Sequence, residues 1–260
     1  MANAFRLDER VAVVTGAGRG IGAAIATAYA EAGADVVLVA RTREQLATTA
    51  ERVRASGRRA IAVPCDITNL AALSVVVERT IAEMGRLDII VNNAGGASPR
   101  SFFETTGADL QEAFHFNVTA SFELIKHAVP HLLASGQGSV INITSIFGRI
   151  AGRGLLVYGT VKAALAQMTR LLAADLSPRV RVNAIAPGVI ETDALKAALT
   201  NQIRSRAVAA TPLRRLGSVE DVAATAVWLA SPAASYVTGK VIEVDGGAEA
   251  PTLPSELPDL

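Results

Sequence analysis

Tyr158 and Lys162 are the residues whose types and spacing first suggest chemistry. They are four positions apart in a segment with helical periodicity, so both side chains lie on one face of a predicted helix. An unperturbed tyrosine has a pKa of about 10, and a nearby ammonium favours its phenolate form. The pair could therefore move a proton by general acid–base catalysis. Alone, the spacing recurs by chance in many helices, where such a lysine is a solvated charge and such a tyrosine lies at an amphipathic edge.

Two further polar residues have positions from which they could assist this pair. Ser145 follows the predicted strand at residues 138–143, where its hydroxyl could donate to an oxygen that gains negative charge. Asn117 lies inside a predicted helix, although asparagine is a poor helix former. Alone, Ser145 would more simply cap the following segment, and Asn117 would more simply face solvent. The combination of all four residues favours a catalytic set.

A glycine-rich turn near the N-terminus could bind phosphate. It reads Thr15-Gly16-Ala17-Gly18-Arg19-Gly20-Ile21-Gly22 and joins an apolar run at residues 11–14 to an alanine-rich helical segment. Glycines allow positive φ and close backbone approach, and a helix N-terminus presents free N–H groups and partial positive charge to a pyrophosphate. The spacing is G-x-x-x-G-x-G and not the commoner G-x-G-x-x-G. A glycine turn can also be a tight strand–helix connection, so the remaining motifs decide.

The elements that must position these residues alternate between strand and helix. The predicted strands are residues 11–14, 35–40, 60–65, 87–91, 138–143, 180–185 and 241–244. The predicted helices are residues 21–32, 42–57, 69–85, 107–134, 157–177, 194–208 (as a pair) and 219–229. This alternation predicts parallel βαβ crossovers in a doubly wound α/β sheet. With no linker, repeat or low-complexity block, we expect one domain over residues 1–260.

Composition narrows the class of protein. Half of the 260 residues are hydrophobic but only 4% are aromatic, which is typical of helices packed on a parallel sheet. A net charge of +1 gives no argument for nucleic acid or a membrane surface. One cysteine, no signal peptide and no apolar run near ~18 residues predict a soluble cytoplasmic protein. The histidines at 115, 127 and 131 have no partners at metal-ligand spacing, so we expect no metal.

Polar residues follow several of the predicted strands. Ligands of doubly wound sheets bind at the carboxyl ends of the strands, so these residues should converge on one crevice. They are Thr15, Arg41, Asp66, Asn92, Asn93, Ser145 and the loop after Pro187. The first turn of the second helix, Thr42-Arg43-Glu44-Gln45, also has the spacing of a capping box.

Taken together, these motifs resemble the short-chain dehydrogenase/reductase family over residues 7–247. The resemblance includes the glycine turn, Asp66, Asn92-Asn93-Ala94-Gly95, Asn117, Ser145, Tyr158-x-x-x-Lys162, Asn183 and Pro187-Gly188 with Thr192 beyond. Ser145 precedes Tyr158 by 13 residues, which is typical of the family. The resemblance implies a Rossmann-type, mainly parallel seven-stranded sheet with helices on both faces. It also implies hydride transfer between a nicotinamide cofactor and an alcohol or ketone.

The resemblance assigns roles to the four candidate catalytic residues. Tyr158 would be the acid in carbonyl reduction and the base in alcohol oxidation, helped by Lys162 and by the positive charge of an oxidised nicotinamide. Lys162 would also hold the nicotinamide ribose. Ser145 would bind the substrate oxygen. Asn117 would kink its helix and hold a water that links the lysine to solvent.

The resemblance also implies a set of cofactor-binding residues. Asp66 would bind the adenine, and the segment from Pro187 to Thr192 would hold the carboxamide. The full set is Gly16, Gly18, Arg19, Gly20, Ile21, Gly22, Arg41, Asp66, Ile67, Asn93, Ala94, Gly95, Tyr158, Lys162, Pro187, Gly188, Ile190 and Thr192.

The end of the second strand distinguishes NADP(H) from NAD(H). An acid there accepts from a free ribose 2′-hydroxyl, whereas an arginine accommodates the 2′-phosphate. Here the strand ends in Ala40-Arg41, and Arg19 lies in the glycine turn. Two arginines can form charge-assisted contacts with one phosphate, so NADP(H) is favoured and NAD(H) stays possible. In the alternative, Arg41 pairs with Glu44 and Arg19 faces solvent.

The substrate side is expected to be apolar. Residues 96–103, 146–156 and 191–212 would surround a ketone or alcohol, with 191–212 as a lid and 248–260 as a tail. The apolar candidates are Ile146, Phe147, Ile150, Leu155, Leu156, Leu195 and Leu199. Several stretches resemble the bacterial 7α-hydroxysteroid dehydrogenases, and the 3-oxoacyl-carrier-protein reductases share much of the framework. The alternatives are an NAD-dependent hydroxysteroid dehydrogenase and a catalytically silent nucleotide-binding scaffold.

Family members are usually tetramers, so the resemblance implies a homotetramer. The long central helices, the last helix at residues 222–229 and the last strand would form its interfaces.

Overall fold

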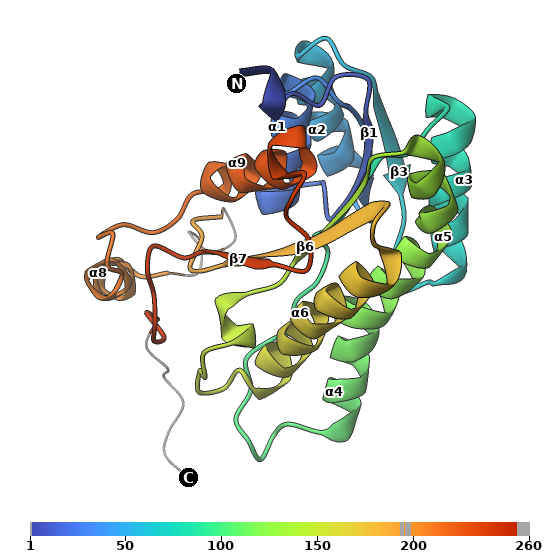
Figure 1. Cartoon of the computed structure of the whole chain (residues 1–260). Helices are drawn as coiled ribbons and strands as arrows, with labels where there is room; N and C mark the ends of the chain where they lie inside the picture. The colour runs from blue at the N-terminus through green and yellow to red at the C-terminus, as the bar shows by residue number, and fades with distance from the viewer. Residues whose placement is uncertain (1, 193–194, 196–198, 254–260) are drawn as a thin grey trace.

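A seven-stranded parallel sheet forms the centre of the computed structural model, which describes residues 2–192, 195 and 199–253 (Figure 1). The spatial order is β3-β2-β1-β4-β5-β6-β7. The strands are β1 (Val11–Thr15), β2 (Asp35–Ala40), β3 (Ala60–Pro64), β4 (Ile89–Asn92), β5 (Gly138–Ile143), β6 (Val180–Pro187) and β7 (Val241–Val244). Because the order reverses between β1 and β4, the ligand-binding switch point lies beside these two strands. The predicted Rossmann-type fold is confirmed.

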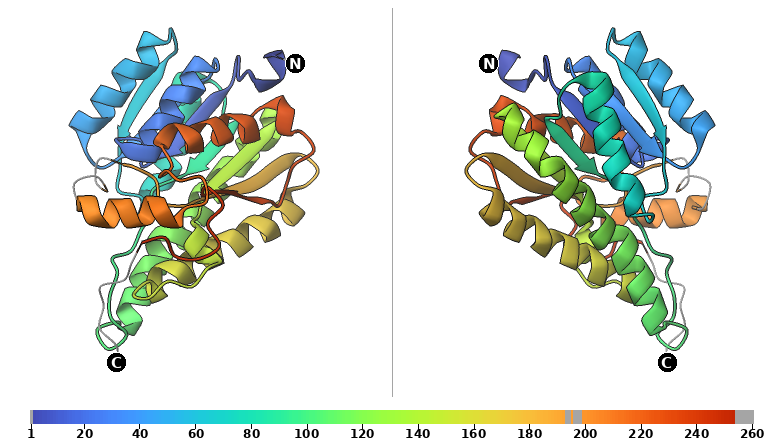
Figure 2. Two further views of the ribbon diagram at one scale, coloured as in Figure 1. Left: turned by 90° about the vertical axis from the view of Figure 1, so that its left-hand side faces the viewer. Right: turned by 90° about the vertical axis from the view of Figure 1, so that its right-hand side faces the viewer.

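Helices cover both faces of this sheet (Figure 2). They are α1 (Gly20–Glu31), α2 (Arg43–Ala55), α3 (Ala71–Met84), α4 (Gly107–Phe114), α5 (Ala120–Ser135), α6 (Leu156–Leu176), α8 (Asn201–Ala210) and α9 (Val219–Ala230). One apolar core includes Ile25 of α1, Leu46 of α2 and Leu229 of α9. The opposite core includes Leu73 of α3 and Leu124 of α5. Strands covered on both faces need no polar side, which is why every residue of β1, β4 and β5 is buried.

The predicted helix at residues 107–134 is interrupted. A π-helical segment, His115–Thr119, separates α4 from α5 and contains Asn117. Single π turns inside α-helices occur often at functional sites. In this segment the Asn117 side chain hydrogen-bonds both to the Ala113 carbonyl of the preceding helical turn and to the loop at Gly96.

The predicted capping box at the start of α2 is wrong. Thr42 is the N-cap residue, but its side chain makes no capping hydrogen bond. The partner expected for it, Gln45, lies against the glycine turn, where a Cβ added to Gly18 would come 3.0 Å from Gln45 Oε1. Competition from this tertiary contact explains the loss of the local motif.

The C-terminal part of the chain returns to the sheet edge. Of the predicted helical pair at 194–208, α8 accounts for the second half, whereas residues 193–194 and 196–198 lie outside the described residues. In the predicted tail, Ala248 and Thr252 are buried, and residues 254–260 lie outside the described residues. No helix in the described part of the chain combines the length and apolar character needed to cross a bilayer.

Candidate active site

The carboxyl ends of β1 and β4 are joined by hydrogen bonds that hold the glycine turn in place. Thr15 Oγ1 accepts from the backbone N–H groups of Asn93 at 3.0 Å and Ala94 at 3.1 Å. Asn93 Nδ2 donates to the Thr15 carbonyl at 3.0 Å and to the Gly16 carbonyl at 3.3 Å. The sheet therefore fixes both strand ends at the switch point before any ligand binds.

Glycine is required at two places in this cradle. A Cβ at Gly22 would lie 2.3 Å from the Gly16 carbonyl oxygen, and Gly16 itself has φ +64°. The side chain of the N-cap residue Arg19 makes no capping hydrogen bond to α1, so the first N–H groups of this helix face the turn without a side-chain partner. A tight backbone cradle at a free helix N-terminus fits a pyrophosphate.

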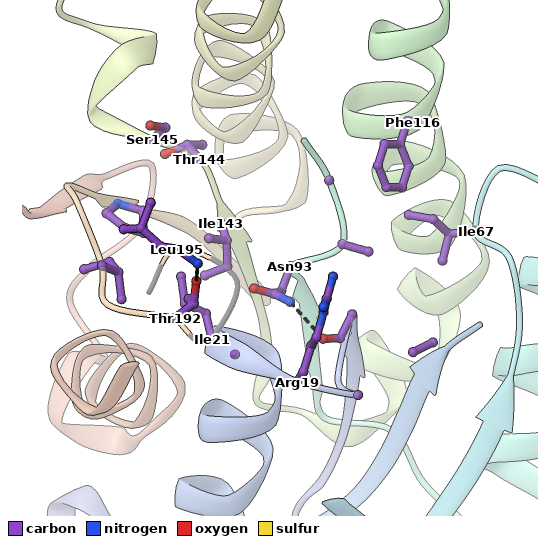
Figure 3. A pocket seen from close by; sticks show the side chains of 18 of the residues that line it. Arg19, Ile21, Ile67, Asn93, Phe116, Ile143, Thr144, Ser145, Thr192 and Leu195 are labelled. Atoms are coloured by element: carbon purple, nitrogen blue, oxygen red, sulfur yellow. Dashed lines mark hydrogen bonds between the residues drawn. The ribbon is translucent and has the colours of Figure 1, made fainter. Parts of the chain in front are cut away.

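All the predicted cofactor residues except Gly22 line one cavity of about 660 Å³ (Figure 3). In Figure 3, Ser145 lies at one end of this cavity, Ile67 and Phe116 lie at another, and Arg19 and Asn93 lie between them. The lining contains Gly16, Gly18, Arg19, Gly20, Ile21, Arg41, Asp66, Ile67, Asn93, Ala94, Gly95, Ser145, Tyr158, Lys162, Pro187, Gly188, Ile190 and Thr192. The crevice expected at the strand ends is therefore present.

Several predicted residues do not line this cavity. Gly22 packs under the glycine turn. Asn117 is buried beside Gly95 and is absent from the cavity lining. Thr15 and Asn92 are buried in the strand-end hydrogen bonds, where Asn92 Nδ2 donates to Asn142 Oδ1 at 2.9 Å. These four residues support the cavity and do not reach a ligand in it.

The catalytic candidates gather at one end of the cavity. Lys162 is buried, and its ammonium donates to the Ile143 carbonyl at 3.0 Å and lies 5.7 Å from the centre of the Tyr158 ring. The Ser145 hydroxyl accepts from Phe147 N at 3.2 Å and is hydrogen-bonded to the Tyr158 phenol. α6 supplies the tyrosine and the lysine, and the end of β5 supplies the serine. A capping role and a catalytic role for Ser145 are thus compatible.

Burial sets the pKa values of this pair. It raises the pKa of Tyr158, and the hydrogen bond from Ser145 opposes that rise. Burial also lowers the pKa of Lys162 to about 8. In the chain by itself, the pKa shift of Tyr158 is opposite to the one expected from Lys162 together with an oxidised nicotinamide, because desolvation by burial is its largest cause.

Asn117 holds the loop that follows β4. Its Oδ1 accepts from Gly96 N at 2.8 Å, and its Nδ2 donates to the carbonyls of Gly96 and Ala113, each at 2.9 Å. A Cβ at Gly95 would come 2.5 Å from Asn117 Oδ1 and 3.1 Å from Lys162 Nζ. The π-helical segment thus brings Asn117 close to Lys162.

The part of the cavity away from Ser145 combines one anion, Asp66, with two cations, Arg19 and Arg41. Asp66 accepts from the backbone and the hydroxyl of Thr68, and these bonds, with help from Arg41, lower the pKa of Asp66. Arg19 and Arg41 are exposed, and neither forms an ion pair with a carboxylate of the described residues. The alternative pairing of Arg41 with Glu44 is absent from that part of the chain.

The residues expected around the substrate lie in different places. Phe147 and Leu195 line the cavity, whereas Ile146 and Ile150 pack against Ala248. Residues 96–98 and Arg100 line a second cavity of about 600 Å³ beside α4. Sequence reasoning missed Thr42, Gln45, Phe116 and Leu253, which also line the first cavity. The position of Leu253 had no sequence signal, because its segment has no periodicity.

No three His, Cys, Asp or Glu side chains among residues 2–192, 195 and 199–253 lie close enough together to hold a metal ion. His115 contacts the carbonyl oxygen of Thr68 at 2.8 Å through Nε2. That contact joins the π-helical segment to the loop that carries Asp66.

Comparison with known proteins agrees with this geometry. The family described as enoyl-(acyl carrier protein) reductase matches residues 16–249. The chain is 40% identical to 7α-hydroxysteroid dehydrogenase of Escherichia coli over 94% of this chain and 95% of that protein. This chain belongs to the short-chain dehydrogenase/reductase family. As a member, it is an oxidoreductase that acts on alcohol or ketone groups with a nicotinamide cofactor.

Two further similarities extend over nearly the whole chain of this family member. It is 53% identical to an uncharacterized oxidoreductase of Mycobacterium tuberculosis, over 98% of each chain. A solved structure of 7α-hydroxysteroid dehydrogenase in complex with NADH and 7-oxo glycochenodeoxycholic acid superposes with a TM-score of 0.93. That structure is 38% identical, and the match covers 98% of this chain and 99% of the other.

Proposed function

We propose that this protein is an NADP(H)-dependent oxidoreductase that interconverts an apolar secondary alcohol and its ketone, with Tyr158 as general acid/base. The observation that carries the proposal is one continuous cavity. It has Ser145, Tyr158 and Lys162 at one end, the glycine cradle in the middle, and Arg19 and Arg41 along its adenosine part. That order matches the order of the reacting and binding groups of a dinucleotide.

The residues present fit a nicotinamide dinucleotide. The glycine turn would receive the pyrophosphate, Asp66 and Ile67 the adenine, and Lys162 the nicotinamide ribose. The segment from Pro187 to Thr192 would hold the carboxamide. When bound, the cofactor supplies or accepts the hydride.

The chain's own residues handle the proton and the developing charge. In the direction of reduction, Ser145 donates a hydrogen bond to the substrate oxygen, and Tyr158 gives that oxygen a proton. Lys162 favours the tyrosinate that results, and its lowered pKa of about 8 lets the amine exchange a proton near neutral pH. In the direction of oxidation, Tyr158 as the tyrosinate accepts the proton of the alcohol, and Ser145 again hydrogen-bonds to the substrate oxygen.

The preference for NADP(H) rests on the cations. No carboxylate follows β2, and Arg19 and Arg41 are available to a 2′-phosphate. An NAD-dependent hydroxysteroid dehydrogenase is the second candidate, because the similar solved structure of 7α-hydroxysteroid dehydrogenase holds NADH. The walls near Ser145 include Phe147, Leu195 and Leu253, which suit an apolar ring system in either case.

A homotetramer is part of the proposal. Phe114, Phe122 and Leu171 are exposed on α4, α5 and α6 in the single chain, and such residues suit burial against a second copy.

Fluorescence titration of the purified protein with NADPH and with NADH tests the cofactor assignment. Tighter binding of NADPH supports the roles of Arg19 and Arg41 and justifies a panel of ketones that includes steroids and 3-oxoacyl thioesters. Tighter binding of NADH would favour the second candidate, and binding of neither would contradict the proposal.

A further inference from the structure

Arg149 joins the loop after Ser145 to the C-terminal part of the chain. It follows a 3-10 helix, Ile146–Gly148, that begins directly after Ser145. Its Nε and Nη2 donate to the two carboxylate oxygens of Glu243 on β7 at 2.6 and 3.0 Å. Its Nη1 donates to Glu249 Oε2 at 2.7 Å, and Nη2 also reaches the Ala248 carbonyl at 3.4 Å. All three guanidinium nitrogens therefore hold the chain from β7 onward, in the bidentate geometry that arginine favours.

Apolar contacts run beside this ionic cluster. Ala248 is buried against Ile146 and Ile150, and Phe147 packs on the same group. On the other side, Leu213 N donates to the Gly246 carbonyl at 3.1 Å. The segment that begins at residue 245 therefore lies between the Ser145 loop and the residues that follow α8.

This segment ends at the substrate end of the cavity. Thr252 is only 5% exposed, and Leu253 lines the cavity together with Phe147 and Leu195. Arg149, Glu243 and Glu249 do not belong to the cavity lining in the described part of the chain. The ionic cluster can thus act on the cavity only through the backbone that it holds.

From this arrangement we infer that residues 245–253 are a wall of the substrate pocket and that Arg149 is a positioning residue that holds this wall against the Ser145 loop. The separation between this wall and the Ser145 loop determines which ketones fit beside Tyr158. The inference rests on the proposed function for its substrate class. With the Arg149 bonds intact, the wall should favour compact ring ketones. Without these bonds, the pocket should admit bulkier ketones and lose contacts to small ketones.

The bonds from Arg149 to Glu243, Glu249 and Ala248, called the clamp below, are tested by hydrogen–deuterium exchange of the full chain. Arg149→Ala and Glu249→Ala should both speed exchange in the peptide that covers residues 246–253. The cluster is exposed, so raising the salt concentration should speed exchange in the unmodified protein and narrow its difference from the variants. Arg79→Ala, which removes an exposed ion pair with Glu83 on α3, is the matched control and should leave this peptide unchanged. Unaltered exchange in both cluster variants would overturn the clamp.

The wall is tested by kinetics with cyclohexanone as the small ketone and a steroid ketone as the bulky one. In Arg149→Ala, the ratio of kcat/KM for the steroid ketone to that for cyclohexanone should rise by about tenfold, a change typical of altered pocket contacts. The loss for cyclohexanone should appear mainly in KM, because a wall contact binds ground state and transition state alike. Arg149→Lys should restore the ratio in part, because an ammonium cannot replace the bidentate contact. An unchanged ratio alongside faster exchange would overturn the wall.

Failure of the proposed function is distinguishable from failure of this inference. It would appear as no turnover of either ketone by the unmodified protein with NADPH or NADH. The exchange comparison reads the clamp without turnover. Addition of the steroid ketone should then slow exchange in the 246–253 peptide if the wall contacts it, and no change would overturn the wall.

Discussion

The side chain of Asn117 forms two hydrogen bonds with the backbone of Gly96: it accepts from Gly96 N at 2.8 Å and donates to Gly96 O at 2.9 Å. This double contact fixes the loop after β4 to the π-helical segment between α4 and α5. The neighbouring Gly95 lies beside both Asn117 Oδ1 and Lys162 Nζ. One buried amide therefore positions the loop after β4 beside Lys162.

Asn117→Ala should damage both stability and activity. It leaves the partly buried polar groups of Gly96 and the buried carbonyl of Ala113 without partners, which costs about 1–3 kcal/mol of the free energy of unfolding. Turnover should fall by about 10²-fold as the loop shifts relative to Lys162. Chemical denaturation and ketone-reduction kinetics measure the two effects. Asn117→Asp keeps one acceptor and should be intermediate; a fully active, fully stable Asn117→Ala would refute this role.

Arg41→Ala should weaken NADPH binding while leaving NADH binding nearly unchanged. Loss of a charge-assisted contact to the 2′-phosphate predicts a decrease of about 10–100-fold in NADPH affinity. Arg43→Ala is the control, because Arg43 is also exposed near the start of α2 but does not line the cavity. Equal losses for NADPH and NADH would mean that Arg41 does not read the phosphate.

Lys162 should leave a pH signature in the free energy of unfolding. Its folded pKa of about 8 lies below its unfolded value, so between these values the unfolded chain binds more protons and stability rises with pH. Relative to Lys162→Met, the unmodified protein should therefore gain stability from pH 7.5 to pH 9.5, by roughly 2 kcal/mol. The raised pKa of Tyr158 acts only above pH ~10, with the opposite sign. Denaturation curves of both proteins at the two pH values measure the difference, and a constant difference would contradict the buried-ammonium account.

Gly22→Ala should destabilise the glycine turn. The added Cβ would lie 2.3 Å from the Gly16 carbonyl oxygen, so α1 must move, at a cost of about 1–3 kcal/mol. Cofactor affinity should fall with it, because the same turn would receive the pyrophosphate. Gly107→Ala is the control, since a Cβ at that first position of α4 meets no atom within 4 Å. If the Gly22→Ala protein were as stable as the Gly107→Ala protein, the turn would accommodate a Cβ at position 22, which would contradict this prediction.

The sequence predicted those elements whose structure is determined by neighbouring residues, and it failed where a distant contact decides. β1 and β5 were predicted to within a residue, because buried runs such as Val11-Ala12-Val13-Val14 suit only a covered strand. The capping box at Thr42 failed because Gln45 contacts the glycine turn, which is distant in sequence.

The site shows the same division. Residues at strand ends, such as Arg41 and Asp66, reached the predicted cavity because the parallel topology places all strand ends together. Whether a polar residue there faces the ligand or the interior depends on its bonds, and Thr15 and Asn92 face inward. Leu253 was unpredictable, since its segment has no periodicity and is joined to the Ser145 loop by contacts between residues far apart in the sequence, such as Arg149 with Glu243 and Glu249.

The central claim is that the Tyr158 hydroxyl transfers the proton, and Tyr158→Phe tests it most directly. Phenylalanine keeps the ring beside Lys162 and removes only the hydroxyl. We predict that kcat/KM for ketone reduction falls by about 10³-fold, while the dissociation constant for NADPH, measured by fluorescence titration, stays within about threefold. Activity within about tenfold of the unmodified protein would contradict the mechanism.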